Sequence, residues 1–270
     1  MPYSTLSAIK CQMLVAIDSR VDDYQHLLNG LVPGAEAIVL DPNRDGVAQI
    51  SEALQNSPDL TSLHIVSHGS PGSVQLGSTR LCSETLDRYV TQLRGWSAAN
   101  SILLYGCRVA AGEVGVAFVE QLRQLTGADI AASNSLTGNA DLGGDWEFEV
   151  RSNQYSVPLA FKEQSRDSYF ATLTTFNIDS TDDDADGSFA GLSLRESIIA
   201  ANQDAMVGDA PAGTGTDEII LPAGTFTFTI GGENEANAMT GDLDITDNLT
   251  IGGAGAGSTI IDAAMLDRVF

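Results

Sequence analysis

Short apolar runs alternate with amphipathic stretches from Met13 to about Val150, and this alternation limits the folds open to the chain more than any other feature. Strands joined by helical crossovers build a mostly parallel sheet covered by helices, so an α/β domain is expected. Strands are expected at Met13–Ile17, Glu36–Leu40, Leu63–Ser67, Ile102–Tyr105, Asp129–Ala132 and Glu147–Val150. Helices are expected at Val21–Asn29, Val47–Gln55, Glu84–Leu93 and Glu113–Leu125.

Two of the apolar runs end in residues whose side chains can act in catalysis, a histidine and a cysteine. One closes on His68 and Gly69, the other on Gly106 and Cys107. Ligands of parallel sheets bind beyond the carboxyl ends of the strands, where both residues lie. A thiol is nucleophilic only as thiolate, and a nearby imidazole can take its proton and later return it. We interpret His68 and Cys107 as a candidate catalytic dyad. The alternative, a buried thiol and a hydrogen-bonded strand-end histidine, stays open. His64, deeper in the same strand, is interpreted as structural.

A change of composition divides the chain after the polar stretch Lys162–Ser168. We expect an α/β domain over residues 11–155, a linker over 156–175 and a second region over 176–270. The second region is strongly acidic and has short strands between glycine-rich turns, a pattern typical of stacked rungs in a β-solenoid. These strands are expected at Glu218–Leu221, Thr225–Ile230, Asp242–Thr246, Asn248–Ile251 and Thr259–Asp262.

A helix is expected near the start of the second region. Ser193 and Glu196 stand three residues apart before an apolar stretch, which is the spacing of a capping box, and the helix should reach about Asn202. The strand pattern is still incomplete at Leu266–Phe270, so we expect a fragment of a longer product.

Charge and composition limit the partners. The formal charge of −23, from 36 acidic and 13 basic residues, argues against nucleic acid as a partner and against anionic membranes. No run approaches the roughly 18 apolar residues of a membrane span, and Met1–Lys10 lacks the pattern of a secretory signal. Cys11, Cys82 and Cys107 are too few and too widely spaced for a disulfide framework or a CxxC metal site.

Calcium is the one cofactor that the sequence suggests, and none is required for the dyad. Asp182, Asp184 and Asp186 alternate before Gly187, so their oxygens are candidate calcium ligands, although Ser193 replaces the acid at position twelve of the EF-hand pattern. A solvated acidic linker is the alternative.

A second stretch has the same spacing, with an acid at position twelve. It runs from Asp41 to Glu52, but the residues before it predict a strand where an EF-hand needs a helix. A strand-to-helix turn with Asp45 near the N-cap explains it better.

Residues 13 to about 150 resemble the bacterial domain-of-unknown-function 4347 family. The segments that carry the resemblance are Ile17-Asp18-Ser19-Arg20, Val39-Leu40-Asp41-Pro42, His64-Ile65-Val66-Ser67-His68-Gly69 and Leu104-Tyr105-Gly106-Cys107. That family lies at the N-terminus of giant surface proteins and adhesins and looks like a distant member of the caspase-like cysteine peptidases. The resemblance implies a caspase-like three-layer sandwich with a mostly parallel sheet. It also implies His68 as base, Cys107 as nucleophile and Gly69 as a backbone amide near the oxyanion.

Residues 176–263 resemble a second family, named for a CSLREA motif that opens right-handed parallel β-helices of bacterial surface proteins. Here the motif reads Leu192-Ser193-Leu194-Arg195-Glu196-Ser197, so Leu192 replaces its cysteine and Ser197 its last alanine. The resemblance implies a capping helix and the first rungs of an incomplete right-handed parallel β-helix over 176–270.

The two resemblances together imply the N-terminal part of a large secreted or cell-surface bacterial protein. Its cysteine endopeptidase domain would act on a peptide of a partner or of its own parent chain. The alternative is a non-enzymatic recognition or export module on an adhesin β-helix scaffold, with a cell-surface or matrix ligand.

Overall fold

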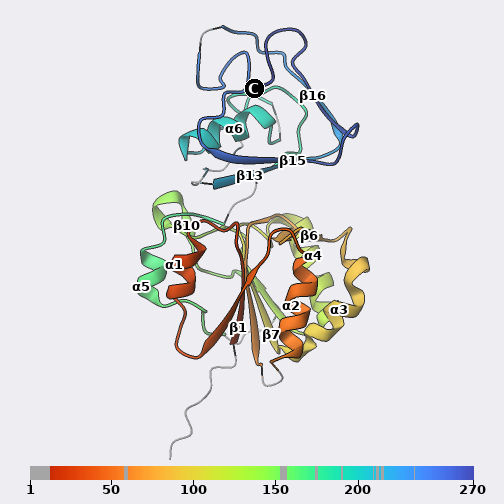
Figure 1. Cartoon of the computed structure of the whole chain (residues 1–270), viewed down its shortest axis with the longest axis vertical. Helices are drawn as coiled ribbons and strands as arrows, with labels where there is room; N and C mark the ends of the chain where they lie inside the picture. The colour runs from red at the N-terminus through yellow and green to blue at the C-terminus, as the bar shows by residue number, and fades with distance from the viewer. Residues whose placement is uncertain are drawn as a thin grey trace, which may run out of the picture.

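The chain folds into two parts that follow one another along the sequence (Figure 1). The computed structural model describes residues 13–57, 60–152, 157–173, 176–189, 191–208, 210, 213, 216–233 and 235–270. The first part is mixed α/β, and the second combines one helix with short strands.

A six-stranded sheet forms the centre of the first part, in the order β11-β8-β7-β3-β1-β2. All neighbours pair in parallel except β11, which runs antiparallel to β8. The predicted mostly parallel sheet is therefore confirmed, although its last strand is shorter than expected. The strands are β1 (Met13–Asp18), β2 (Ala35–Leu40), β3 (Ser62–Val66), β7 (Ser101–Tyr105), β8 (Asp129–Ala132) and β11 (Val150–Arg151).

Helices cover both faces of this sheet, which is compatible with a three-layer α/β sandwich (Figure 1). On one side lie α1 (Tyr24–Asn29) and α5 (Glu163–Asp167), and on the other α2 (Gly46–Gln55), α3 (Val90–Gly95) and α4 (Gly112–Thr126). The helix expected over Glu84–Leu93 begins instead as a 3₁₀ turn at Leu86–Tyr89 and continues as α3.

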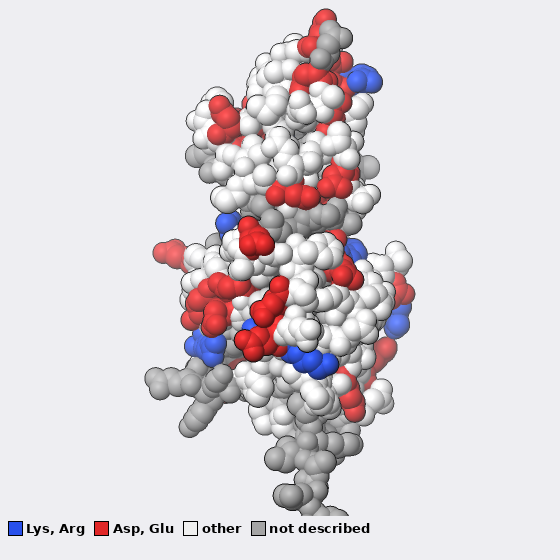
Figure 2. Space-filling model, turned by 90° about the vertical axis from the view of Figure 1, so that its left-hand side faces the viewer, with Lys and Arg blue, Asp and Glu red and all other residues white. Residues whose placement is uncertain are grey.

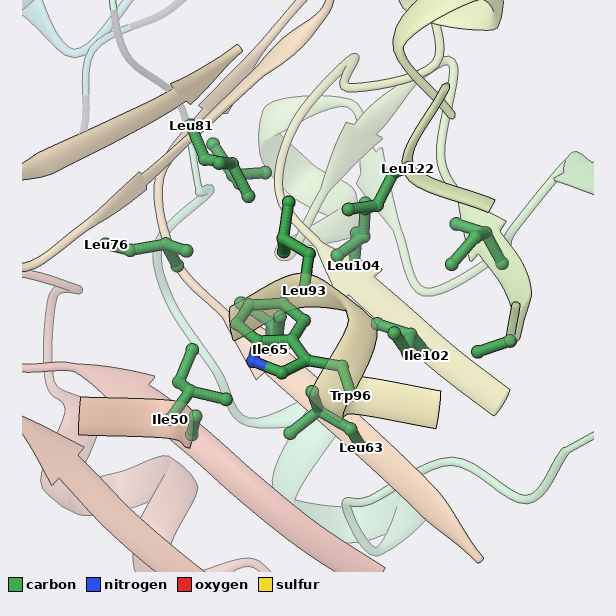
Figure 3. Close-up of a cluster of buried hydrophobic side chains, with 14 of the residues drawn as sticks. Ile50, Leu63, Ile65, Leu76, Leu81, Leu93, Trp96, Ile102, Leu104 and Leu122 are labelled. Atoms are coloured by element: carbon green, nitrogen blue, oxygen red, sulfur yellow. The ribbon is translucent and has the colours of Figure 1, made fainter. Parts of the chain in front are cut away.

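Trp96 lies at the centre of the core between the sheet and α2, α3 and α4 (Figure 3). Its ring is fully buried, and its indole N–H donates to the Ser51 hydroxyl at 2.9 Å, which satisfies the only polar atom of the side chain. Around it pack aliphatic side chains from strands and helices: Ile50, Leu63, Ile65, Leu76, Leu81, Leu93, Ile102, Leu104 and Leu122.

The segment expected as a linker, 156–175, was assigned wrongly. Over 157–173, the part that the structure describes, it packs into the second core, on the opposite face of the sheet. Phe161, Tyr169 and Leu173 are buried there beside Tyr105 and Trp146. The polar residues that suggested a linker form the short helix α5, none of whose residues is buried, whereas the apolar residues on either side of it enter the core. The α/β domain therefore extends to residue 173.

Two small sheets accompany the main one and were not predicted. The antiparallel strands β4 (Gly69–Ser70), β5 (Ser73–Leu76) and β6 (Thr79–Cys82) follow β3 directly. The strands β9 (Leu136–Thr137) and β10 (Gly144–Asp145) pair in parallel.

The second part contains helix α6 (Leu194–Gln203) and five described strands that pair only in parallel. The predicted capping box is confirmed, because Ser193 and Glu196 bond each other's backbone amides. The strand expected over Asp242–Thr246 is absent; Leu243 instead donates its amide to the carbonyl of Val269. The strands are β12 (Phe176–Asn177), β13 (Thr216–Leu221), β14 (Gly224–Thr227), β15 (Asn248–Gly253) and β16 (Thr259–Asp262).

Arg195 connects α6 to the loops around it. Its side chain is 1% exposed and pairs with Asp183, with Nε and Oδ1 at 2.6 Å. Its terminal nitrogens donate to the carbonyls of Ala238 (2.8 Å) and Gly241 (2.9 Å), and its guanidinium lies over the ring of Phe228. A buried charge with this many partners stabilises one arrangement of the loops, because removing a partner would leave the charge unsatisfied.

Acidic side chains spread over the surface of both parts, with few basic ones among them (Figure 2). Among the residues that the structure describes, none of the helices combines the length and the apolar character that crossing a membrane requires.

The backbones approach closely where β3 and β7 end. The two strands pair up to Val66 and Tyr105, and the amide of Ser67 continues the pairing by donating to the carbonyl of Tyr105 at 3.1 Å. Beyond it, a Cβ on Gly69 would lie 2.9 Å from the carbonyl carbon of Gly106 and 2.6 Å from Cγ2 of Val109. The position therefore has room for glycine alone.

We predict that Gly69→Ala lowers the free energy of unfolding by about 1–3 kcal/mol, since the added methyl group overpacks the strand end. Gly95→Ala is the matched control. Nothing lies within 4 Å of a Cβ at Gly95, so this change should be neutral or stabilise by roughly 0.4–1 kcal/mol. Urea denaturation of the three proteins measures both effects. Equal midpoints for Gly69→Ala and the parent chain would show that the strand ends relax freely.

His64 gives the fold a pH dependence. Its ring is fully buried, with Nδ1 3.0 Å from the Tyr105 hydroxyl and Nε2 3.1 Å from the Ser62 hydroxyl. Burial lowers the pKa of His64 from 6.5 to about 3. Below pH 6.5 the unfolded chain therefore binds a proton that the folded chain does not, and stability falls as the pH drops from 6.5 towards 3.

We predict that His64→Gln removes the part of the pH dependence of stability that comes from His64. Between pH 7.5 and pH 5 the parent chain should lose about 2 kcal/mol more unfolding free energy than the variant, at 1.36 kcal/mol per pH unit below 6.5. His26→Gln is the control and should keep the parent's loss. Urea denaturation at the two pH values measures the difference, and parallel curves for the parent chain and His64→Gln would contradict the assignment.

Candidate active site

The two residues of the predicted dyad follow neighbouring strands of the main sheet. His68 is the second residue after β3 and Cys107 the second after β7, and these strands are neighbours in parallel register. Their side chains are 3% and 1% exposed. The carboxyl ends of the strands face the second part of the chain (Figure 1), whose Glu218 and Thr250 line a cavity together with His68.

His68 is held in one tautomer by a backbone carbonyl. Its Nε2 lies 3.1 Å from the carbonyl oxygen of Arg20, which can only accept, so Nε2 carries the proton. In the neutral imidazole, Nδ1 is then the nitrogen without a proton. It is buried and has no hydrogen-bond partner among the described residues. A buried nitrogen with an unused lone pair is what a general base at this position needs.

Asp18 fixes the residue that orients His68. The carboxylate is 1% exposed and accepts from the amide of Arg20 at 3.0 Å and from its Nε at 3.2 Å. It also accepts from the amide of Gly77 at 2.6 Å. Residue-type patterns did not reveal this role of Arg20, because its carbonyl acts on His68. The only signal was its place in the Ile17–Arg20 segment that carries the family resemblance.

Cys107 is anchored by Thr137 in β9. Its sulfur accepts from the amide of Thr137 at 3.2 Å and lies 3.5 Å from the carbonyl oxygen of the same residue. Neither Cys107 nor Cys82 forms a disulfide. The thiol therefore has a fixed direction beside β9.

Two backbone amides of the site converge on one oxygen atom. Gly69 and Cys107 donate their amides to the carbonyl oxygen of Leu173, at 3.1 and 3.0 Å. Of these two amides, the family resemblance implies that of Gly69 for the oxyanion. Two fixed N–H groups aimed at a single oxygen are the donor arrangement that stabilises a tetrahedral oxyanion in acyl transfer. Leu173 lies in the stretch that its composition predicts to be a linker, so the pattern of residues gives no sign of this role for its carbonyl.

Leu173 ends an extended segment that lies along β9. The carbonyl of Ala171 accepts from the amide of Asn139 at 2.9 Å, and Thr172 forms an antiparallel bridge with Gly138. The amide of Leu173 donates to the carbonyl of Thr137 at 3.0 Å. Residues 171–173 are thus hydrogen-bonded beside the dyad as an added antiparallel strand would be.

A cavity of about 440 Å³ opens next to His68. Besides His68, the first part of the chain contributes the loop from Ser19 to Asp23 and the first two residues of α1, and the second contributes Asp217, Glu218 and Thr250. Acidic side chains dominate the charge of its walls, which disfavours anionic ligands.

The aspartates proposed for calcium are engaged with their own loop. Asp184 is 2% exposed and accepts from the amides of Asp186 (3.1 Å) and Phe189 (2.7 Å). Asp186 accepts from the amide of Ser188 at 3.1 Å, and the hydroxyl of Ser180 donates to Asp182. Within the described ranges, no three His, Cys, Asp or Glu side chains form a metal-binding group. Calcium at Asp182, Asp184 and Asp186 stays a prediction.

The loop before α2 has the structural role that the sequence suggested. Asp45 is the N-cap of α2, where its carboxylate accepts from the amide of Ala48 at 2.9 Å. Glu52, the acid at position twelve, pairs on the surface with Arg44.

Comparisons with known proteins bear on the first part. A search of curated proteins and a search of solved structures each found no match. Residues 14–173 match the model of a family described as Domain of unknown function (DUF4347). The match includes Arg20, His68, Gly69 and Cys107 and ends at Leu173, and it covers more than half of the chain. On this match, the chain belongs to the domain-of-unknown-function 4347 family.

Proposed function

We propose that residues 14–173 are a caspase-like cysteine endopeptidase domain. The observation that carries the proposal is the convergence of the Gly69 and Cys107 amides on one carbonyl oxygen. These amides belong to the residue after His68 and to the thiol residue itself. The unpartnered Nδ1 of His68 adds support, since it leaves a lone pair for the thiol proton.

The mechanism follows from these positions. His68 Nδ1 takes the proton of Cys107, and the thiolate attacks a peptide carbonyl whose oxygen lies between the two amides. The tetrahedral intermediate collapses when the imidazolium protonates the leaving amine, which leaves a thioester on Cys107. Water, reaching the site through the cavity beside His68, hydrolyses the thioester and restores the thiol. No metal or cofactor takes part in these steps.

The second part is proposed as the start of a right-handed parallel β-helix on a secreted or cell-surface protein. Support comes from the purely parallel pairing of its described strands and from the capping box that opens α6. Arg195, the arginine of the CSLREA-like motif, adds support, because it holds the loop carbonyls of Ala238 and Gly241 to α6.

A non-enzymatic recognition or export module is the second candidate function. One observation favours it: the two amides are already occupied by Leu173, and Cys107 is only 1% exposed. A site permanently filled by its own chain would bind no external peptide, and the domain would then act through its surface.

Alkylation of the thiols by iodoacetamide separates the two functions. At pH 7 an ordinary thiol of pKa about 8.5 is only a few per cent thiolate, so a thiol activated by His68 should react about 10-fold faster or more than Cys82. The rates of the individual cysteines are followed by peptide mass spectrometry. His68→Ala should remove the advantage of Cys107 and leave the rate of Cys82 unchanged.

The same measurement on Gly138→Ala covers the case in which residues 171–173 shield the thiol. A Cβ at Gly138 would lie 2.3 Å from the carbonyl oxygen of Ala171, so the variant displaces that segment. If Cys107 reacts no faster than Cys82 in both the parent chain and Gly138→Ala, the peptidase proposal is wrong and the recognition module is favoured.

A further inference from the structure

We propose that the peptide bond following Leu173 is the substrate of Cys107 in the same chain, so that the domain releases itself from the downstream part. The inference rests on the proposed peptidase function and goes further by naming the bond. It is carried by the position of the segment 171–173, which lies in the site as an extended peptide substrate would.

The backbone of the segment is bound over its whole described length. Three interactions hold it to 137–139: the bond from Asn139 to Ala171, the bridge between Gly138 and Thr172, and the bond from Leu173 to Thr137. Antiparallel addition of a strand is a general mode of peptide recognition, in which main-chain bonds give affinity and side-chain pockets give specificity.

The groove is shaped for this backbone. Gly138 has φ of +135°, a conformation that residues with a side chain rarely adopt, and a Cβ there would lie 2.3 Å from the carbonyl oxygen of Ala171. A glycine is therefore required directly after β9, where Gly138 lies opposite Thr172.

Leu173 occupies the position of the residue before the bond to be cut. Its carbonyl oxygen receives the amides of Gly69 and Cys107, and its own amide donates to Thr137, whose carbonyl also lies 3.5 Å from the Cys107 sulfur. The sulfur and the amide of Leu173 thus share one backbone partner, the carbonyl of Thr137. Holding a nucleophile and a carbonyl in place in this way converts a bimolecular reaction into a unimolecular one.

The side chain of Leu173 explains why this residue fits. It is fully buried and belongs to the same apolar cluster as Cys107, Leu136 and Tyr169. Tyr169 fixes the approach of the segment, because its hydroxyl donates to the carbonyl of Asp22 at 2.9 Å. The site should accordingly prefer an apolar residue before the cleaved bond.

The cleavage is balanced with water as the only co-reactant. The Cys107 proton passes to His68 as the S–C bond to the Leu173 carbonyl forms, and the C–N bond to residue 174 breaks when the imidazolium protonates that nitrogen. His68 then takes a proton from water as the water oxygen adds to the thioester carbon. The S–C bond breaks, the imidazolium returns this proton to the sulfur, and the new carboxylic acid of Leu173 loses its proton to the solvent.

The predicted cut lies at a boundary of the chain. The family match ends at residue 173, and the acidic, strand-rich second region follows. The pair between Arg20 and Glu218 would still connect the two products after cleavage, so they must be separated under denaturing conditions to be seen.

The test follows the full chain during cell-free synthesis, with denaturing gels and intact-mass analysis. We expect a product ending at Leu173 and a product beginning at Thr174. Cleavage should be first order and independent of chain concentration, and the Cys107→Ala chain should stay intact even when mixed with the parent chain. His68→Ala should slow cleavage at least about 100-fold, and Cys82→Ala should leave it unchanged.

Gly138→Ala distinguishes a bound substrate from a coincidental contact. The variant should slow cleavage about 100-fold, because the segment no longer lies in register with the sulfur. Alkylation of Cys107 should be as fast as in the parent chain or faster, since the thiol is intact and less covered. If the segment had only a structural role, Gly138→Ala would not slow cleavage while leaving the alkylation of Cys107 as fast as in the parent chain.

Two results overturn the inference, and they are distinguishable. If Cys107 shows His68-dependent alkylation but the chain stays intact or is cut elsewhere, the peptidase function stands and Leu173 is a covering residue instead of a substrate. If Cys107 is unreactive in the parent chain and in Gly138→Ala, the peptidase function fails and the inference fails with it.

Discussion

β3 and β7 pair in parallel with Val66 opposite Tyr105, and the bond from Ser67 to Tyr105 carries that register one residue past the strands. This register brings His68 level with Cys107, and the two glycines beside them allow the backbones to touch. The amides of Gly69 and Cys107 can reach one oxygen only because of this contact. A shift of one residue between the strands would place the side chains of His68 and Cys107 on opposite faces of the sheet. It would also move the amides of Gly69 and Cys107 apart.

The sequence was informative wherever side-chain type determines structure. Alternating apolar and amphipathic segments predicted the strands and helices of the main sheet, because burial on one or two faces imposes a period on the residues. His68 and Cys107 became candidates because each ends an apolar run beside a glycine. Ser193 and Glu196 were recognised because a capping box depends on side-chain oxygens, and Asp45 for the same reason.

The rest of the site could not be foreseen because it is made of backbone groups. Arg20 and Leu173 act through carbonyls and Thr137 through both its amide and its carbonyl, and the chemistry of a main chain is the same for every residue. The short strands β4 and β9 have two residues each, too few for any periodicity. The prediction of a linker over 156–175 was wrong because of helix α5. Its exposed polar residues separate the buried Phe161 from the buried Tyr169, so a segment of the core has the composition of a linker.

Arg20 makes contacts in both parts of the chain. Its carbonyl holds the imidazole of His68, while its guanidinium bonds Asp18, the carbonyl of Gly77 and Glu218 of the second part. A displacement of Glu218 would therefore act on Arg20, whose carbonyl oxygen determines the tautomer of His68. One residue of the first part thus binds both the imidazole of His68, through its backbone, and the second part of the chain, through its side chain.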